Sequence, residues 1–417
     1  NRSAKEFFDE QIYPLFFDNP TFLMMANNSP FDQASKRNKK TGILDTPEGR
    51  ATVLASFHEK VESGARDAST LIGGPAADMT KTTSGQAPEH MLMAFSEQDV
   101  YASWIGNAAA VGVHGATNLL FDRPEVLLLL VEGWAEYRRL LDETPGLKCL
   151  QVQAWNGRWL THRLSPGYRP TTSMKWMEDG LKKDKKSGIV NIVGVPWVNL
   201  IFELAQTFPN ERLLVYGYNL GQMNETYGFV HLALPEVANF FDLYKRLFPM
   251  SSGLRRKAEG IFNTHFMLSR AWQQGSIGVT ALEPAKLRDY QSGQKSVEAL
   301  AKKKGDALLP FYLYQTWIIA MLNNESLFGE ATKVAKVLHE YESRATRGRT
   351  KHSQQVKAVL EAKSRIPFIE ALTTLAQTEP DLGPSFTAVV EEILRLPPSD
   401  VKQFLTLIRF RYATNSN

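Results

Sequence analysis

The last third of the chain has the hydrophobic spacing of a set of amphipathic helices. Between Phe386 and Leu394, five apolar residues occupy positions i, i+3, i+4, i+7 and i+8. Residues 401–408 and residues 334–341 each repeat the first four of these steps. Because a helix turns once in about 3.6 residues, each set lies on one helix face. The spacing therefore predicts a C-terminal antiparallel helical bundle over residues 290–417.

The sequence also marks where one of these helices ends and the next begins. Pro397 and Pro398 interrupt the apolar repeat, and proline cannot continue a helix. Ser399 is a residue type that caps helices, and Asp400 would place a carboxylate in the first turn of the next helix. We therefore expect a helix boundary at these four residues.

Positive charge gathers in the middle of the expected bundle. Between Lys333 and Arg365 the chain has nine Lys and Arg residues against three Glu, whereas the net charge of the whole chain is +4. Such an excess suits a surface that meets a polyanion. A solvated helix face beside an exposed loop is the alternative. The candidate nucleic-acid-binding residues of this cluster are Arg344, Arg347, Arg349 and Lys351.

Composition places the chain among ordinary globular proteins. Its 417 residues allow two or three domains, and 43% of them are hydrophobic, enough for a sizeable core. The isoelectric point near 8.9 is only mildly basic. The cations are nevertheless clustered in five runs, namely residues 36–40, 182–186, 255–257, 302–304 and 344–351.

Cysteine and hydropathy bear on the compartment. A single cysteine, Cys149, excludes an intramolecular disulfide framework and a multi-cysteine zinc site. Around Leu127 the longest aliphatic run has six residues, against roughly 20 for a membrane span. The chain opens without the segments of a signal peptide. We therefore expect a cytoplasmic protein without membrane contact.

The strongest strand signal lies around Asn156-Gly157. Residues 148–155 and 158–164 flank this pair, and Asn-Gly is the preferred type I′ hairpin turn because both residues accept positive φ. We therefore expect a β-hairpin there. Further strands are expected at 189–195, 212–218 and 228–234, with helices between them, so residues 1–285 are predicted to form an α+β domain.

Five further elements are expected from local signals. A helix should run from Thr46 or Pro47 to Glu62, and another should open at Asp122 as its cap. Residues 96–113 look helical. Residues 63–88, rich in Gly, Ser, Thr and Pro, are expected to form a long loop, and residues 275–294 a linker.

Catalytic motifs are absent from the sequence. No P-loop, GxGxxG turn or GxSxG elbow occurs, and His58-Glu59 lacks the second histidine of a zinc-protease helix. Glu361-Ala362-Lys363 has the spacing of some nucleases but lies in a predicted helix. We therefore expect no catalytic residue, metal or cofactor. An active site assembled from scattered residues remains the alternative.

Three stretches instead combine residues that contact nucleic acids. Lys and Arg neutralise phosphates, Asn, Gln and Arg contact base edges, and aromatic rings stack on bases. For each stretch an ordinary turn is the alternative. The candidate binding residues are Asn27, Asn28, Lys36, Arg37, Lys39 and Lys40 in the first, Gln153, Asn156 and Arg158 in the second, and Asn219 in the third.

Taken together, these parts resemble the large subunit of type I CRISPR Cascade complexes. The shared features are an α+β N-terminal region with basic and Asn-containing loops, no visible active site, and a C-terminal helical bundle with a basic middle. The Asn27-Asn28-Ser29-Pro30-Phe31 loop and the ending Phe404–Phe410 look like those of the type I-B-like branch. The resemblance covers most of the chain as an architecture, without a short signature motif.

The resemblance implies a non-catalytic role in antiviral defence. The N-terminal region would recognise the short motif beside the DNA target, and the bundle would stabilise the R-loop, while a guide RNA supplies most of the sequence specificity. The implied partners are guide RNA, target double-stranded DNA, the backbone and RNA-end-binding subunits, and a helicase-nuclease or transposition proteins. A nucleic-acid-modifying enzyme and a structural subunit that binds an acidic protein partner are the alternatives.

Overall fold

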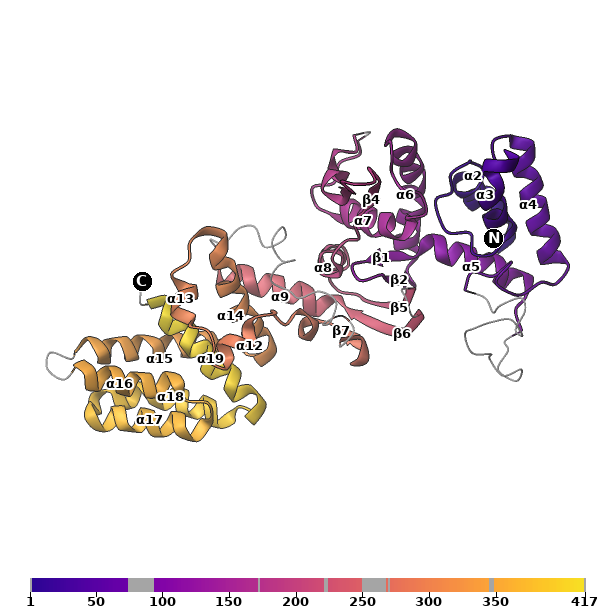
Figure 1. The fold of residues 1–417 in the computed structure, drawn as a ribbon. Coiled ribbons are helices and arrows are strands. Elements are labelled where there is room, and N and C mark those ends of the chain that lie inside the picture. The colour runs from indigo at the N-terminus through magenta and orange to yellow at the C-terminus, as the bar shows by residue number, and fades with distance from the viewer. Residues whose placement is uncertain are drawn as a thin grey trace. The chain divides into compact units, whose positions relative to one another are not determined.

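The computed structural model describes residues 2–73, 94–171, 173–220, 224–249, 268, 271–344 and 349–415. The chain forms two compact units. The first comprises residues 1–207 and 213–231, and the second comprises residues 208–212 and 232–417. The fold is α+β and rich in helices, with a small sheet (Figure 1).

The first unit begins with helices that enclose an aromatic core. Phe8, Phe31, Phe57 and Trp104 are each at most 1% exposed, and the Phe57 ring lies 5.2 Å from both Phe31 and Trp104, measured between centroids. Aromatic rings bury large apolar areas, so this cluster fixes the helices that contribute to it. The helices of this part are α1 (Ala4–Phe7), the π-helix η1 (Phe8–Ile12), α2 (Tyr13–Phe16), α3 (Pro30–Thr41), α4 (Pro47–Glu62) and α5 (Glu97–Ala109), and the four rings come from η1, α3, α4 and α5.

The rest of the first unit builds a sheet and the helices beside it. Strands β1, β2, β5 and β6 are neighbours in that order, and β2 pairs antiparallel with both β1 and β5. Strands β3 and β4 form a separate antiparallel pair. The elements are β1 (Val111–Val113), β2 (Thr117–Phe121), α6 (Pro124–Glu143), α7 (Val152–Leu164), η4 (Lys175–Gly180), β3 (Leu181–Lys183), β4 (Val190–Ile192), α8 (Trp197–Thr207), β5 (Arg212–Leu220) and β6 (Asn224–Ala233).

The hairpin expected around Asn156-Gly157 is wrong, because residues 152–164 form helix α7. Trp155 is fully buried and stacks on Tyr137, with 5.4 Å between ring centroids. A Cβ atom on Gly157 would lie 2.2 Å from the carbonyl oxygen of Gly112 in β1, so glycine serves close helix–strand packing here rather than a turn. Burial of the tryptophans outweighs the local turn preference of Asn-Gly.

Other local expectations agree with the structure to different degrees. Helix α4 has the predicted bounds, and the Thr46 hydroxyl accepts a hydrogen bond from the Gly49 amide at 3.1 Å, as a cap should. Strand β4 lies within the predicted range 189–195 and β5 covers 212–218, while β6 starts four residues before the predicted 228–234 and ends one residue before its end. Helix α5 stops at Ala109, before β1, and α6 is preceded by Arg123 instead of being capped by Asp122.

The described residues of the second unit are mostly helical and include the two-residue strand β7. Helix α19 packs on α13, α14 and α15, α16 packs on α17, and α18 packs on both α15 and α17 (Figure 1). The elements are α9 (Leu234–Leu247), β7 (Ser276–Ile277), η6 (Val279–Leu282), α12 (Leu287–Gln291), α13 (Val297–Ala301), η7 (Gly305–Leu308), α14 (Leu309–Leu322), α15 (Ser326–Ser343), α16 (Arg349–Glu361), α17 (Arg365–Thr378), η8 (Pro380–Leu382), α18 (Gly383–Arg395) and α19 (Pro398–Asn415).

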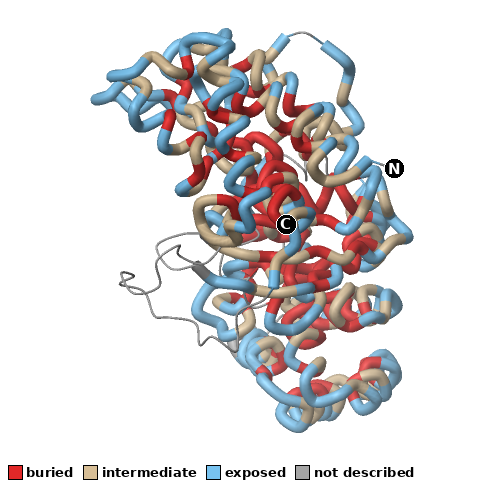
Figure 2. Tube along the Cα trace, turned by 90° about the vertical axis from the view of Figure 1, so that its right-hand side faces the viewer, coloured by how far each residue is buried: buried red, intermediate tan, exposed pale blue. Residues whose placement is uncertain are grey.

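Apolar spacing explains why these helices pack. Phe386, Val389 and Ile393 on α18 are at most 3% exposed, and so are Phe404 and Ile408 on α19. The buried residues alternate with exposed ones along the helices (Figure 2). The predicted helices of the C-terminal region are therefore confirmed. Ser399 lies inside the first turn of α19 instead of capping it.

The boundary between the units differs from the one expected near residue 285. Helix α9 packs on α14 and η6, so residues from 232 onward belong with the C-terminal helices. The expected linker, residues 275–294, contains β7, η6 and α12. Most of the helix expected at 253–274 and most of the loop expected at 63–88 lie outside the described residues. Within the described part of the chain, no helix is both long and apolar enough to cross a membrane.

Candidate nucleic-acid interface

Asn27 is used to hold the chain before α3. Its φ of +50° lies in the left-handed region, which asparagine tolerates. Its side-chain amide donates hydrogen bonds to the carbonyl oxygens of Ala68 and Leu71, at 2.7 and 2.9 Å. The Asn28 side chain is exposed, while its backbone amide donates to Ala68. Asn27 is thus committed to the fold, and Asn28 keeps its side chain in solvent.

The three residues expected at a hairpin tip lie on α7 and contact the protein interior. Asn156 is 0% exposed, and its amide donates to the carbonyl oxygens of Ala108 and Ala110 at 2.7 and 2.9 Å. These carbonyls belong to the end of α5, where the helix leaves acceptors unsatisfied. Gln153 donates to Asn107 Oδ1 at 3.1 Å, and Arg158 Nε donates to the Val193 carbonyl at 2.7 Å. Their expected placement on an exposed loop is wrong.

Asn219 lies on β5 and joins two parts of the sheet. Its amide donates to the Gly115 carbonyl at 3.0 Å and to the Tyr227 hydroxyl at 3.4 Å. It pairs with Thr117 of β2 in the antiparallel ladder. These contacts close the turn between β1 and β2 against β5, which is a structural task.

Of the four cations expected to cluster in the bundle, the structure describes the side chains of Arg344 and Lys351. Arg344 follows α15 and donates to Asp381 Oδ2 at 2.7 Å, with Glu379 at 3.6 Å. The bond to Asp381 raises the pKa of Arg344 and lowers that of the Asp381 carboxyl. Lys351 is exposed on α16. Arg347 and the side chain of Arg349 lie outside the described residues.

Helix α3 presents the remaining predicted cations, which we call the α3 basic face: Lys36, Arg37, Lys39 and Lys40. All four are exposed. Lys36 forms an ion pair with Asp32, four residues earlier, at 2.7 Å. Among the described residues, Arg37, Lys39 and Lys40 have no carboxylate within ion-pair distance.

Helix geometry gathers these cations on the side away from the core. At about 100° per residue, the four fall within an arc of about 160°. Phe31 and Ala34 lie on the opposite side of the helix and are 1% and 8% exposed. Positive side chains in the last turn also complement the negative end of the helix dipole, so part of their role is structural.

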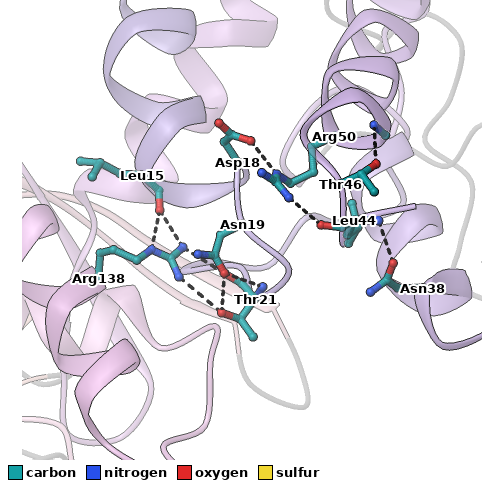
Figure 3. A network of polar contacts seen from close by, with 10 residues as sticks. Leu15, Asp18, Asn19, Thr21, Asn38, Leu44, Thr46, Arg50 and Arg138 are labelled. Atoms are coloured by element: carbon teal, nitrogen blue, oxygen red, sulfur yellow. Dashed lines mark hydrogen bonds and ion pairs between the residues drawn. The ribbon is translucent and has the colours of Figure 1, made fainter. Parts of the chain in front are cut away.

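Polar contacts fix the orientation of α3 relative to α4 (Figure 3). Asn38 accepts from the Leu44 amide at 2.7 Å and donates to Asp45 at 3.0 Å. Arg50 on α4 donates to Asp18 at 2.6 Å and to the Leu44 carbonyl at 2.9 Å. The α3 basic face therefore lies on a braced helix instead of a loose loop, as a precise contact surface requires.

A half-buried polar group lies among the N-terminal helices. The ring of His58 contacts the Tyr101 hydroxyl through Nδ1 at 2.7 Å and Asp9 Oδ1 through Nε2 at 3.1 Å. Lys5 contacts the other oxygen of Asp9 at 2.8 Å. Burial lowers the pKa of His58 and raises that of Tyr101. Both ring nitrogens of His58 thus have partners within the protein.

The possible nuclease spacing Glu361-Ala362-Lys363 has an ordinary structural setting. Glu361 ends α16 and pairs with Lys357 at 3.7 Å on the same helix. Within the described residues, no group of three or more His, Cys, Asp or Glu side chains is arranged to hold a metal ion.

Sequence patterns did not reveal one set of cations. Lys363, Lys402 and Arg409 line one pocket in the second unit. Lys402 and Arg409 are seven residues apart, which indicates a shared face of α19. No local spacing connects Lys363 to them, because it lies between α16 and α17.

Comparisons with protein-family models, with curated proteins and with solved structures found no match for this chain. Functional inference therefore depends on the residues themselves.

Proposed function

We propose that the protein is a non-catalytic nucleic-acid-binding subunit of an RNA-guided DNA-targeting complex of the Cascade type. One observation carries the nucleic-acid part of this proposal: Arg37, Lys39 and Lys40 lie exposed on one side of a braced helix, with no ion-pair partner among the described residues. The place within a Cascade-type complex rests on the architectural resemblance stated above.

The proposed contact is electrostatic. Each phosphate that Lys or Arg neutralises releases condensed counterions, which gives affinity that does not depend on sequence. Lys36 adds less, because Asp32 already offsets its charge. The α3 basic face would thus position the protein on the DNA backbone beside the target. Asn28, exposed just before α3, is the predicted amide that could contact a base edge.

The first experiment is to purify the protein from its native cell and sequence the nucleic acid bound to it. We expect a short, uniform RNA with repeat-derived ends, together with several other proteins. A protein without RNA would contradict membership of a guide-RNA complex. Partners that stay bound after nuclease treatment would favour a structural subunit with an acidic protein partner, and metal-dependent turnover of nucleic acid would favour an enzyme.

A salt titration tests the α3 basic face directly. The triple variant Arg37→Gln, Lys39→Gln, Lys40→Gln should lower the slope of log affinity for double-stranded DNA against log salt by roughly 2 to 3 units, at about 0.7–0.9 per phosphate contact. The matched control replaces Lys183, Lys185 and Lys186 by Gln, which removes the same charge from exposed positions of the first unit. Equal slopes for the two variants would remove α3 from the interface.

A further inference from the structure

The second unit contains a pocket that the proposed function does not use. Its volume is about 380 Å³. It lies where the end of α12, the connection between α16 and α17, and one side of α19 meet, and its polar lining comes from Gln291, Ser292, Lys363, Lys402 and Arg409. We call it the bundle pocket. Its volume is near the lower end of the roughly 300–1,000 Å³ that holds small-molecule ligands.

The charge around the bundle pocket has one sign. Three of its lining side chains are cations, and none of the described lining residues is acidic. Among the described residues, Lys363 and Lys402 have no carboxylate within ion-pair distance. Like charges directed to one volume repel each other, and an anion bound between them would convert that repulsion into attraction.

Arg409 forms the fixed side of the bundle pocket. Its guanidinium donates to the carbonyl oxygens of Tyr290 and Gln291 at 3.1 and 3.3 Å, and to the Thr406 hydroxyl at 2.9 Å. These bonds hold the planar group in place, as a preorganised anion site requires.

Arg409 also lacks full compensation for its burial. Its Nε atom is buried without a hydrogen-bond acceptor. Burial lowers the pKa of Arg409, and the opposing electrostatic effect of Glu298 is smaller. A buried guanidinium whose partners are neutral oxygens is the setting in which an added anion gains most.

We propose that the bundle pocket binds a phosphate group, carried by a nucleotide or by a nucleic-acid strand. Phosphate matches three convergent cations, and arginine and lysine are the side chains that recognise it. Leu405 and Ala362 provide apolar lining for the part of the ligand that carries the phosphate. The bundle pocket is in a different unit from the α3 basic face, so each site can be tested by variants that leave the other unchanged.

Adenosine monophosphate binding to the full-length protein, measured by calorimetry, is the first test. The double variant Lys363→Gln, Lys402→Gln should weaken binding by on the order of tenfold for each charge-assisted hydrogen bond that it removes. Both lysines are exposed, so the fold should tolerate the change. Lys302→Gln with Lys303→Gln is the matched control, since it removes equal charge from exposed positions of the same unit.

Further probes separate the two sources of phosphate. Competition by inorganic phosphate against adenosine monophosphate would show that the pocket recognises the phosphate group, and adenosine monophosphate binding that a single-stranded oligonucleotide does not displace would support a free-nucleotide ligand. Binding of a single-stranded oligonucleotide that weakens in the pocket variant alone would support a strand, and dependence on its 5′-phosphate would assign the strand end. If none of these probes binds, or if the pocket and control variants behave alike, the proposal is overturned.

The α3 triple variant distinguishes this failure from that of the proposed function. It should leave binding of adenosine monophosphate unchanged. If its salt slope for DNA is also unchanged while the bundle pocket still binds phosphate, the proposed function fails and the bundle pocket remains.

Discussion

Helices α3 and α7 both contain residues that the sequence predicts to contact nucleic acid, yet the structure uses them in opposite ways. The lysine and arginine side chains of α3 point away from an aromatic core and are exposed. The polar side chains of α7 point into the fold, where Asn156 binds the last carbonyls of α5. The predicted contact residues are therefore left in solvent on one helix and used to hold the fold together on the other.

The difference comes from what surrounds each helix. Helix α7 packs on α6, α8 and β1, so most of its circumference is covered. Helix α3 packs on α4 and the aromatic core through one side only. A buried polar group on a helix that is packed on most sides must form its hydrogen bonds within the protein. A cation on a solvent-exposed helix face stays hydrated and is available to an external anion.

The largest effect should come from the buried side of this comparison. Asn156→Ala leaves the carbonyls of Ala108 and Ala110 without their donor, and each buried unsatisfied group costs about 1–3 kcal/mol. We expect the free energy of unfolding to fall by roughly 2–4 kcal/mol in urea denaturation. Asn28→Ala, the same change at an exposed side chain, should stay within about 0.5 kcal/mol. Equal losses at the two positions would contradict the assignment of Asn156 to the fold.

The sequence of α7 contains a helical pattern that competes with the turn preference of Asn-Gly. Val152, Trp155, Trp159 and Leu160 are spaced i, i+3, i+7 and i+8, a helical pattern, and all are buried. The turn preference of Asn156-Gly157 outweighed that signal in the prediction. Only the tertiary contact with Gly112 explains why glycine is needed inside the helix.

Long-range pairing sets a second limit on what sequence can predict. The bounds of α4 and the apolar faces of α18 and α19 follow from local spacing and were predictable. The partner of Arg344 is Asp381, two helices later, so the charge count of one window did not show that Arg344 is neutralised. The bundle pocket likewise joins Lys363 to residues of α19 that no local pattern connects to it.

A pair of single substitutions sharpens this distinction between free and paired cations. Arg37→Gln should lower the salt slope for DNA binding by about 0.7–0.9, because it removes one phosphate contact. Arg344→Gln should change the slope less, because Asp381 and Glu379 already offset its charge. A larger change for Arg344 in the same titration would place the interface in the bundle instead.

In exposure, His58 lies between the exposed cations of α3 and the buried amide of Asn156, because its ring is half-buried. Its protonation can be followed through the pH dependence of stability. Because burial lowers its pKa in the folded state, the unfolded state takes up the proton first as the pH falls. Its contribution to stability is therefore present above about pH 6.5, the ordinary histidine value, and is lost as the pH falls toward the lowered pKa. Urea denaturation between pH 7.5 and 5.5 should show a larger loss for the natural protein than for His58→Gln. A matching loss in both would assign the pH dependence to other groups.

The smallest effect on stability should come from breaking the ion pair between Lys36 of the α3 basic face and Asp32. Asp32→Asn removes the carboxylate that Lys36 contacts at 2.7 Å. It also removes a negative charge from the first turn of α3, where the helix dipole favours one. We expect a loss of stability of about 0.3–1 kcal/mol, typical of exposed charge pairs on helices.

The salt slope for DNA binding should rise by up to about 0.9 in the same Asp32→Asn variant, because a fourth cation becomes available to phosphate. Stability and binding would then move in opposite directions, which a purely structural role for the α3 cations does not produce. An unchanged slope with reduced stability would mean that Lys36 faces away from the DNA, and would narrow the interface to Arg37, Lys39 and Lys40.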